Sequence, residues 1–412
     1  MSLSEDAAIF QDHKQLYGPS KLIRKRLRLR PHKPLPPHGS NLYPFPPGVT
    51  GKDLMLSEEQ KNQSITRLVF DPENQPKSGE SFQHDESFEM EVEILELIGG
   101  TPGTGYKPGP QKLVCQVLEA PSASPWDKEH KRPAKGQYLF LKVYDALMWH
   151  KVVDVTKRLL KVTFQADSAF SDEFGAYHFL YKRNLTGFNR DQFERTDFSP
   201  IAPQFYGGWI AQVATVNEEF KDKYRQVAVL ALENVNGVRM QELFSRSGPD
   251  KVVELIARDK KPASFEADLD ERLEIMAQLM HGTVTEEKAG LDHCNLHPRN
   301  VIITMETKGA KPRAVLVGYG NAIIDELRQE PSRTWEYFPK PPHPILRFGW
   351  PRLDRFAGWF PLEWRGPDDY PDRCPLTLKW QVERFGGLVD NPDYTVFADP
   401  APVETTPDEE LP

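Results

Sequence analysis

The sequence predicts an α+β protein with disordered arms, in which an antiparallel sheet comes first and a mainly helical part follows. Stretches that alternate polar and apolar residues indicate strands, and two segments with apolar residues at helical spacing indicate long helices. Both ends are rich in Pro and charge, which disfavours regular structure. The predicted divisions are a Pro-rich and basic N-terminal arm over 1–85, a sheet part over 86–237, a helical part with an aromatic and Pro-rich end over 238–397, and an acidic tail over 398–412.

The composition indicates a folded protein with long loops and narrows the classes of function. A hydrophobic content of 39% supports a packed core, while 37 Pro in 412 residues imply much irregular chain. The net charge of −8 gives no overall basic footprint for nucleic acid. Cys115, Cys294 and Cys374 show no CxxC spacing, so neither a disulfide framework nor a zinc site is expected. Without a signal-peptide pattern or a run of ~18 apolar residues, we expect a cytoplasmic or nuclear protein with no membrane partner.

The N-terminal arm contains a concentrated basic run. Residues 21–33 hold seven Lys and Arg and no acid. Such a run predicts either a nuclear-import signal or a site for an anionic partner, nucleic acid included, and it is where we would expect any nucleic acid to bind. The alternative, which we favour, is a solvated linker that docks on the acidic body. At the other end, residues 398–412 hold five acids and four Pro, which predicts a disordered tail.

A Gly-rich turn joins the first two expected strands. Residues 89–100 alternate acidic and apolar side chains, and residues 112–120 form the return strand. Gly lets the backbone approach a ligand closely, so the N–H groups around Gly100, Gly103 and Gly105 could cover phosphates. The alternative is a plain hairpin loop, because the turn is Pro-rich and long.

Two ionisable residues are placed on apolar faces. In the strand expected over 137–145, Lys142 shares a face with aromatic residues. In the helix expected over 166–183, with Asp167 or Ser168 as N-cap, Glu173 lies in the apolar stripe. Since a buried charge requires a partner, we expect Lys142 and Glu173 to be in contact or bridged by water. The alternative is that Lys142 extends to solvent and Glu173 is partly exposed.

The remaining elements lead to the most informative stretch. A strand over 203–210 and an apolar strand over 225–237, which contains Glu233, precede a helix over 270–290 that ends at Gly290. The stretch "LDHCNLHPRNVIIT" follows, and residues 300–324 then read as a hairpin.

In this order, the elements and motifs resemble the protein-kinase superfamily from about residue 89 to 324. The parts are a Gly-rich hairpin, a strand Lys, a helical Glu, a hinge strand, the His293-x-x-Leu296-x-Pro298-x-Asn300 loop and a hairpin ending in Tyr319-Gly320. The loop is similar to the His-Pro version of aminoglycoside-phosphotransferase-like enzymes and fungal kinase-like proteins.

The resemblance implies a two-lobed kinase-like fold, with an antiparallel-sheet N-lobe and a reduced, mainly helical C-lobe, and it assigns roles to named residues. Lys142 would hold nucleotide phosphates, Glu173 would orient Lys142, and the Gly100, Gly103 and Gly105 loop and Glu233 at the hinge would border the nucleotide. His293 would brace the catalytic loop. Asn300 would be a metal ligand.

Two departures fall on the carboxylates that perform the chemistry. Asn295 stands where the family has its catalytic Asp, and an amide cannot accept a proton at neutral pH. Gly318 stands where the family has its metal-binding Asp. Losing a positioned base typically costs about 10²–10⁴ in rate, and losing a metal ligand removes charge stabilisation. We therefore expect weak ATP binding and little or no use of Mg²⁺.

The part after the hairpin is short and aromatic. Only 92 residues follow Gly320, which is few for a full kinase C-lobe, and Trp335, Trp350, Trp359, Trp364 and Trp380 all lie there. Core packing is the favoured interpretation of these aromatic residues, and a partner-binding surface is the alternative.

Three hypotheses about function follow from these residues. The first is a pseudokinase-like protein that binds other proteins, and nucleotide weakly, through a kinase-type cleft. The second is an atypical ATP-dependent phosphotransferase that retains Lys142, Glu173 and Asn300. The third is a nuclear factor that uses residues 21–33.

Overall fold

The structure is a computed structural model of the 412-residue chain. It describes residues 23–39, 42–80, 82, 85–99, 109–124, 126, 130–149, 160–196, 198–214, 218–247, 252–255, 268–305, 312–330, 338–348, 353–356, 359–361, 364 and 375–396.

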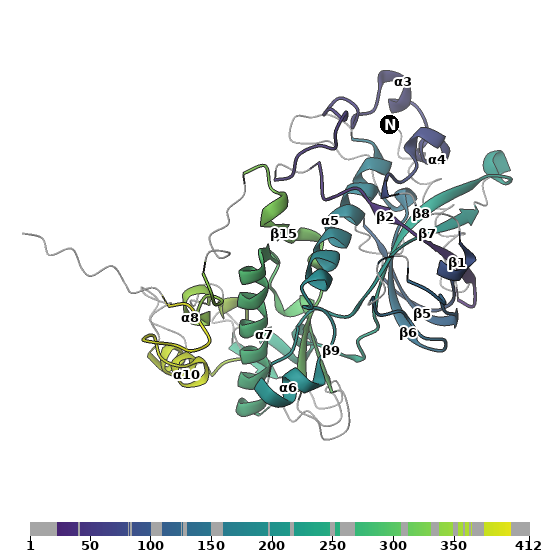
Figure 1. The fold of residues 1–412 in the computed structure, drawn as a ribbon. Helices are drawn as coiled ribbons and strands as arrows, with labels where there is room; N and C mark the ends of the chain where they lie inside the picture. Colours follow the sequence, from purple (N-terminus) through teal and green to yellow (C-terminus); the bar gives the residue numbers. More distant parts are fainter. Residues whose placement is uncertain are drawn as a thin grey trace, which may run out of the picture.

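Helices and strands are mixed along the chain, with strands concentrated in the first part (Figure 1). The α-helices are α3 Glu58–Lys61, α4 Ile65–Phe70, α5 Val162–Lys182, α6 Arg190–Thr196, α7 Leu269–Ala289, α8 Pro344–Arg347 and α10 Pro375–Phe385. The strands are β1 Arg26–Pro31, β2 Lys33–Pro34, β3 Ser78–Glu80, β4 Met90–Gly99, β5 Gln111–Glu119, β6 Tyr138–Tyr144, β7 Phe205–Ala214, β8 Tyr224–Glu233, β9 Gly237–Arg239, β10 Phe244–Ser247, β11 Val252–Leu255, β12 Leu291–Asp292, β13 Val301–Met305, β14 Pro312–Leu316 and β15 Ile323–Ile324.

Six antiparallel strands close into a barrel in the order β1-β4-β5-β6-β8-β7. Alternate residues of each strand point inward, so that Leu139, Leu141 and Val143 of β6 join the barrel interior. The predicted antiparallel sheet is thus present, and its closure into a barrel is what the sequence did not show. A closed barrel has no unpaired edge strands, which removes a common route to aggregation.

Strand β1 closes the barrel, so the predicted arm over residues 1–85 is wrong for this segment. β1 pairs with β4 on one side and β7 on the other, and Leu29 is fully buried. Arg24, just before β1, and the outward-facing Arg26 and Arg28 form ion pairs with glutamates of the β4 region. The pairs are Arg24–Glu93 at 3.0 Å, Arg26–Glu91 at 3.3 Å and Arg28–Glu89. Part of the basic run is therefore docked on acidic neighbours, as in the interpretation that we favoured.

Helix α5 covers the outer face of the barrel and begins earlier than expected. Its N-cap is Lys161, whereas Asp167 and Ser168 lie inside the helix. Asp167 instead accepts the backbone N–H of Lys77 at 3.3 Å, and the Ser168 hydroxyl donates to the His38 carbonyl at 2.9 Å. The two proposed N-cap residues thus attach α5 to the N-terminal segment.

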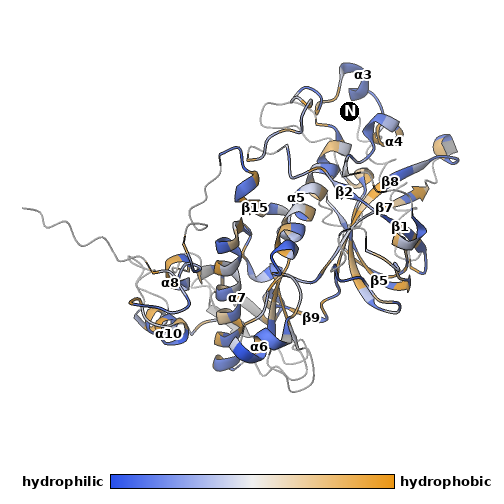
Figure 2. Cartoon of the chain, viewed as in Figure 1, coloured by the Kyte–Doolittle hydropathy of each residue, from blue (hydrophilic) through white to orange (hydrophobic). Residues whose placement is uncertain are grey.

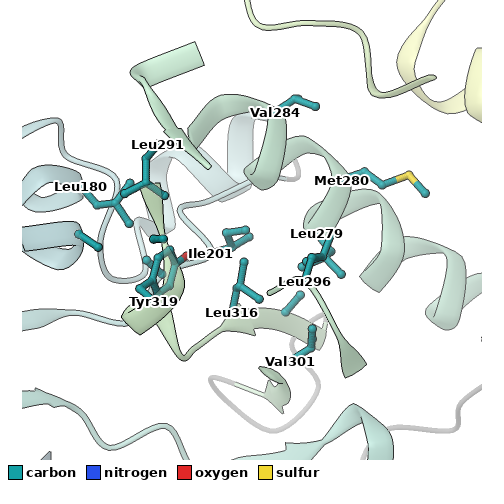
Figure 3. Close-up of a cluster of buried hydrophobic side chains, with 14 of the residues drawn as sticks. Leu180, Ile201, Leu279, Met280, Val284, Leu291, Leu296, Val301, Leu316 and Tyr319 are labelled. Atoms are coloured by element: carbon teal, nitrogen blue, oxygen red, sulfur yellow. The ribbon is translucent and has the colours of Figure 1, made fainter. Parts of the chain in front are cut away.

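A second core lies between α5, α7 and the β13–β14 hairpin. Helix α7 ends at Gly290, whose positive φ of 98° suits a glycine that terminates a helix. Figure 3 shows Leu296 beside Leu279, with Leu316 and Tyr319 in the same buried cluster. The pattern of hydropathy agrees with burial, because β8 is mainly hydrophobic along its buried middle, whereas α6 at the surface is hydrophilic (Figure 2).

The described Trp residues of the C-terminal part pack against this core. Trp359 is fully buried and donates from its indole N–H to the Arg272 carbonyl at 2.8 Å. Trp364 and Trp380 contact each other with ring centroids 6.0 Å apart, and both pack against the core cluster. Core packing, the favoured interpretation, accounts for these three residues, whereas Trp335 and Trp350 lie outside the described residues.

Other predictions also fall outside the described residues. They are Gly100, Gly103 and Gly105 in the first hairpin loop, Cys374, the first part of the basic run and the acidic tail over 398–412. Within the ranges that the structure describes, none of the helices combines the length and apolar character needed to cross a membrane.

The position of β1 gives a test of barrel closure. Replacing buried Leu29 with Ala should lower the free energy of unfolding by about 2–5 kcal/mol, because the cavity would lie in the barrel core. Arg26→Ala on the same strand, which removes only a surface ion pair, should cost less than about 1 kcal/mol. Urea unfolding of both variants measures the difference, and equal small losses would contradict the closed barrel.

Candidate functional site

Lys142 and Glu173 are in direct contact, as expected from the sequence. The Lys142 ammonium on β6 donates to both carboxylate oxygens of Glu173 on α5, at 2.5 and 2.7 Å. The Tyr144 hydroxyl, from the same face of β6, donates to Glu173 Oε2 at 2.5 Å. The side chains of Lys142 and Glu173 are only 11% and 4% exposed. This is a buried ion pair, and the alternative of a Lys142 side chain extended to solvent is excluded.

His293 braces the loop that follows α7. Its Nε2 lies 3.3 Å from the Val317 carbonyl oxygen, and its Nδ1 lies 3.3 Å from the Asn295 backbone nitrogen. Burial lowers the pKa of His293 to about 4, so the ring is neutral at pH 7. A neutral imidazole with its proton on Nε2 satisfies both contacts, since Nε2–H donates to Val317 and Nδ1 accepts from Asn295. His293 therefore connects the loop to the end of β14.

Asn295 and Asn300 are hydrogen-bonded to their own loop. The Asn300 side-chain amide donates to the Asn295 carbonyl at 2.8 Å. The Arg299 guanidinium donates to Asn295 Oδ1 at 3.2 Å. The Asn295 side-chain oxygen thus accepts a hydrogen bond from an arginine. An Asp at position 295 would meet the same arginine.

Gly318 and Gly320 bring the loop and the ion pair together. A Cβ on Gly318 would lie 3.4 Å from Asn300 Oδ1, and a Cβ on Gly320 would lie 3.4 Å from Glu173 Oε2. Gly318 has a φ of +85°, in the left-handed region that favours glycine. Four of the positions that the sequence indicates, 142, 173, 300 and 318, therefore lie at or around this short turn.

A column of buried rings runs through the same region. The ring of His293 contacts that of Tyr319, with centroids 4.5 Å apart, and Tyr319 contacts Tyr177 of α5 at 4.9 Å. Tyr177 in turn stacks with Phe205 of β7 at 6.4 Å. The column joins the loop, the turn, α5 and the barrel, so a movement of any one of them would disturb the packing of the others.

Glu233 holds the end of β8 to two other segments. Glu233 Oε2 accepts the backbone N–H of Gln204 at 2.9 Å, and Oε1 accepts from the Arg313 guanidinium at 3.1 Å. Both of its carboxylate oxygens therefore have protein partners, and the expected place of Glu233 beside a nucleotide stays a prediction.

Nearby carboxylates are directed to other partners. Asp292 accepts the Cys294 backbone N–H at 3.0 Å, and Asp325 pairs with Arg328 at 3.6 Å. Among the described residues, no group of three or more His, Cys, Asp or Glu side chains could hold a metal ion. Asn300 could supply one oxygen ligand, with no carboxylate at position 318 to accompany it.

Three neighbouring residues were not identified from the sequence. Tyr144 is one of the aromatic residues that share a face of the strand with Lys142, but its hydrogen bond to Glu173 depends on the position of α5. Lys112 lies opposite Lys142 in the β5–β6 pair, which only the strand register reveals. Glu286 is buried on α7 and accepts the Tyr319 hydroxyl at 2.6 Å. For Glu286, the one signal in the sequence is a Glu within the apolar stripe of a predicted helix.

Comparisons with known proteins find similarity among solved structures and none among protein sequences. No protein-family model matches the chain, and no curated protein matches it. Among solved structures, it is similar to vaccinia related kinase 3, a protein kinase, with 12% sequence identity and a TM-score of 0.27 over 60% of this chain and 52% of that chain. The chain thus spans about half the length of that structure.

Breaking the Lys142–Glu173 pair should be costly. Glu173→Gln leaves the Lys142 charge buried without its counter-charge, which should lower the free energy of unfolding by about 3–5 kcal/mol. The matched change Glu91→Gln, in an exposed ion pair with Arg26, should cost at most about 1 kcal/mol. Chemical denaturation of the two variants makes the comparison, and a small loss for Glu173→Gln would show that the pair is not a buried ion pair.

The buried Glu286 predicts a dependence of stability on pH. Burial raises the pKa of Glu286 from 4.5 to about 8, so the folded protein keeps a proton that the unfolded chain releases. This contribution is fully present below pH 4.5 and is lost as the pH rises through about 8. Relative to Glu286→Gln, the parent should therefore lose stability over this window, by up to about 1.4 kcal/mol per pH unit. Urea unfolding at pH 5 to 8 measures this, and parallel profiles would contradict it.

Proposed function

We propose that the protein is a non-catalytic, kinase-like protein that binds other proteins and, weakly, nucleotide through a kinase-type cleft between two lobes. The observation that carries the proposal is the buried Lys142–Glu173 pair beside the turn at Gly318, which also borders Asn300 of the loop that contains Asn295. Gly318 and Asn295 are the two residues at which the resemblance to kinases implies carboxylates. The site keeps the parts that hold and orient phosphates, and it lacks those that perform proton transfer and metal binding.

The arrangement of elements supports this assignment. An antiparallel sheet supplies the Lys, the helix against it supplies the Glu, and a helix, loop and hairpin supply His293, Asn300 and the Tyr319 turn. The column of rings from His293 to Phe205 links these parts. Each of these contacts could have a purely structural explanation when taken alone. A nucleotide-type site is one explanation that covers the ion pair, the loop and the turn together.

The site lacks the two carboxylate side chains that phosphoryl transfer would use, at positions 295 and 318. The Asn295 amide oxygen accepts from Arg299 and has no lone pair basic enough to take a hydroxyl proton. A missing base costs about 10²–10⁴ in rate. The missing carboxylate at position 318 is more serious, because phosphoryl transfer depends mainly on positioning and on charge stabilisation by the metal. This argues against the alternative of an atypical phosphotransferase.

Binding is the function that such a site retains. Nucleotide held by Lys142 without a metal would be incompletely neutralised, and its affinity should be low and nearly independent of Mg²⁺. A fold kept without catalysis then serves as a binding surface for other proteins. The alternative of a nuclear factor that uses residues 21–33 is weakened, because Arg24, Arg26 and Arg28 are engaged in ion pairs on the barrel.

Restoring the carboxylates tests the proposal. Gly318→Asp should increase the Mg²⁺-dependent rise in Tm caused by ATP, and it should do so more than Asn295→Asp, whose new carboxylate would pair with Arg299. At a φ of +85°, any side chain at position 318 carries a backbone cost of about 1–2 kcal/mol.

The control for this test is Gly318→Asn, which carries the same backbone cost without the charge and should show no Mg²⁺ dependence. A strong Mg²⁺-dependent shift in the unmodified protein would contradict the proposal. So would a Gly318→Asp variant that folds normally and responds to Mg²⁺ no more than Gly318→Asn does.

A further inference from the structure

A second lysine faces the same side of the sheet as Lys142. Lys112 on β5 is the direct cross-strand partner of Lys142 on β6. Directly opposed residues in an antiparallel pair point to the same face, with Cβ atoms about 4.5–5.5 Å apart. Lys112 is therefore directed toward the side where Glu173 and the Gly318 turn lie. Like charges placed directly opposite each other destabilise a sheet.

The side chain of Lys112 has no acidic partner among the described residues. Within that part of the chain it makes no ion pair or hydrogen bond, although the residue is partly buried. Lys142 and Arg239 both act on it electrostatically as like charges, and Glu173 is the single carboxylate that acts on it favourably. Burial, followed by repulsion from Lys142, lowers its pKa. Because Glu173 already neutralises Lys142, this region carries an excess of positive charge.

The donors left over in this region suit an anion with several oxygens. The Lys142 ammonium has three N–H groups, of which two are directed to Glu173. The three N–H groups of Lys112 make no hydrogen bond to the described residues. Lysine binds phosphate as a compact point charge. Positions 318 and 295 carry Gly and Asn, so an anion here would meet no negative charge from those two positions.

We propose that Lys112 and Lys142 together form a binding site for a polyphosphate chain, as in a nucleoside triphosphate, that operates without a divalent metal. Lys112 supplies the positive charge that a metal ion held by carboxylates would otherwise supply. The inference rests on the proposed function, since it names how the kinase-type site takes its ligand. It also explains why an unfavourable pair of lysines is tolerated, because the bound anion relieves their repulsion.

Lys112→Gln tests the inference because it should raise the Tm of the ligand-free protein and lower its affinity for polyphosphate. In the ligand-free protein, Tm should rise, because the repulsion with Lys142 and the burial of an unpaired charge are removed. In EDTA, inorganic tripolyphosphate should bind at least about tenfold more weakly to the variant than to the parent, measured by calorimetry, since a charged hydrogen bond is lost. Lys112→Arg, which keeps the charge, should retain most of the binding.

The control is Lys135→Gln, at an exposed position in the β5–β6 turn, which should change neither Tm nor affinity. A lower Tm for Lys112→Gln with unchanged tripolyphosphate affinity would overturn the inference and leave Lys112 as a structural residue. The proposed function is judged separately by ATP. Mg²⁺-free tripolyphosphate binding that depends on Lys112, with no additional affinity for ATP over tripolyphosphate, would support the anion site and contradict a nucleotide site.

Discussion

The candidate site depends on the buried ion pair between Lys142 of β6 and Glu173 of α5. Two charges removed from water are costly unless each is fully engaged, and here the ammonium donates to both carboxylate oxygens and the Tyr144 hydroxyl adds another bond. The pair fixes the rotation of α5 against the barrel. That rotation in turn places Tyr177 against Tyr319 and sets the position of the turn that contains Gly318.

The N-terminal segment holds this arrangement from the outside. The Tyr43 hydroxyl donates to the Ala322 carbonyl at 3.2 Å and accepts the Ile324 backbone N–H at 2.8 Å. It therefore holds the chain in place just after the turn at Gly318. On α5, a Cβ at Gly175 would lie only 2.5 Å from Pro37, which shows how closely the segment approaches. The same segment continues from the strand that closes the barrel. The segment that follows β1 thereby connects α5, the turn at Gly318 and the barrel. This connection restricts the movement of α5.

The sequence predicted the parts of the site better than their surroundings. Lys142 and Glu173 could be found because a charged residue on an apolar face demands a partner, and α7 could be found from its periodicity and Gly290. Strand β1 could not be found in this way. Its Arg residues make the segment look like a solvated basic run, and their partners are glutamates some 65 residues away. Arg313 and Gln204 both donate to the Glu233 carboxylate, and these contacts between distant segments do not follow from a local pattern. The role of Lys112 depends on strand register, which a local pattern does not determine.

A kinase-type site that persists without catalysis, as we propose, should transfer no phosphate. The most direct measurement is transfer of the ATP γ-phosphate to water or to a protein acceptor by the unmodified protein in Mg²⁺, with Lys142→Met as the reference. We expect the two proteins to give the same background rate, because neither Asn295 nor Gly318 can supply the base or the metal ligand. Mg²⁺-dependent turnover by the unmodified protein that disappears in Lys142→Met would contradict it.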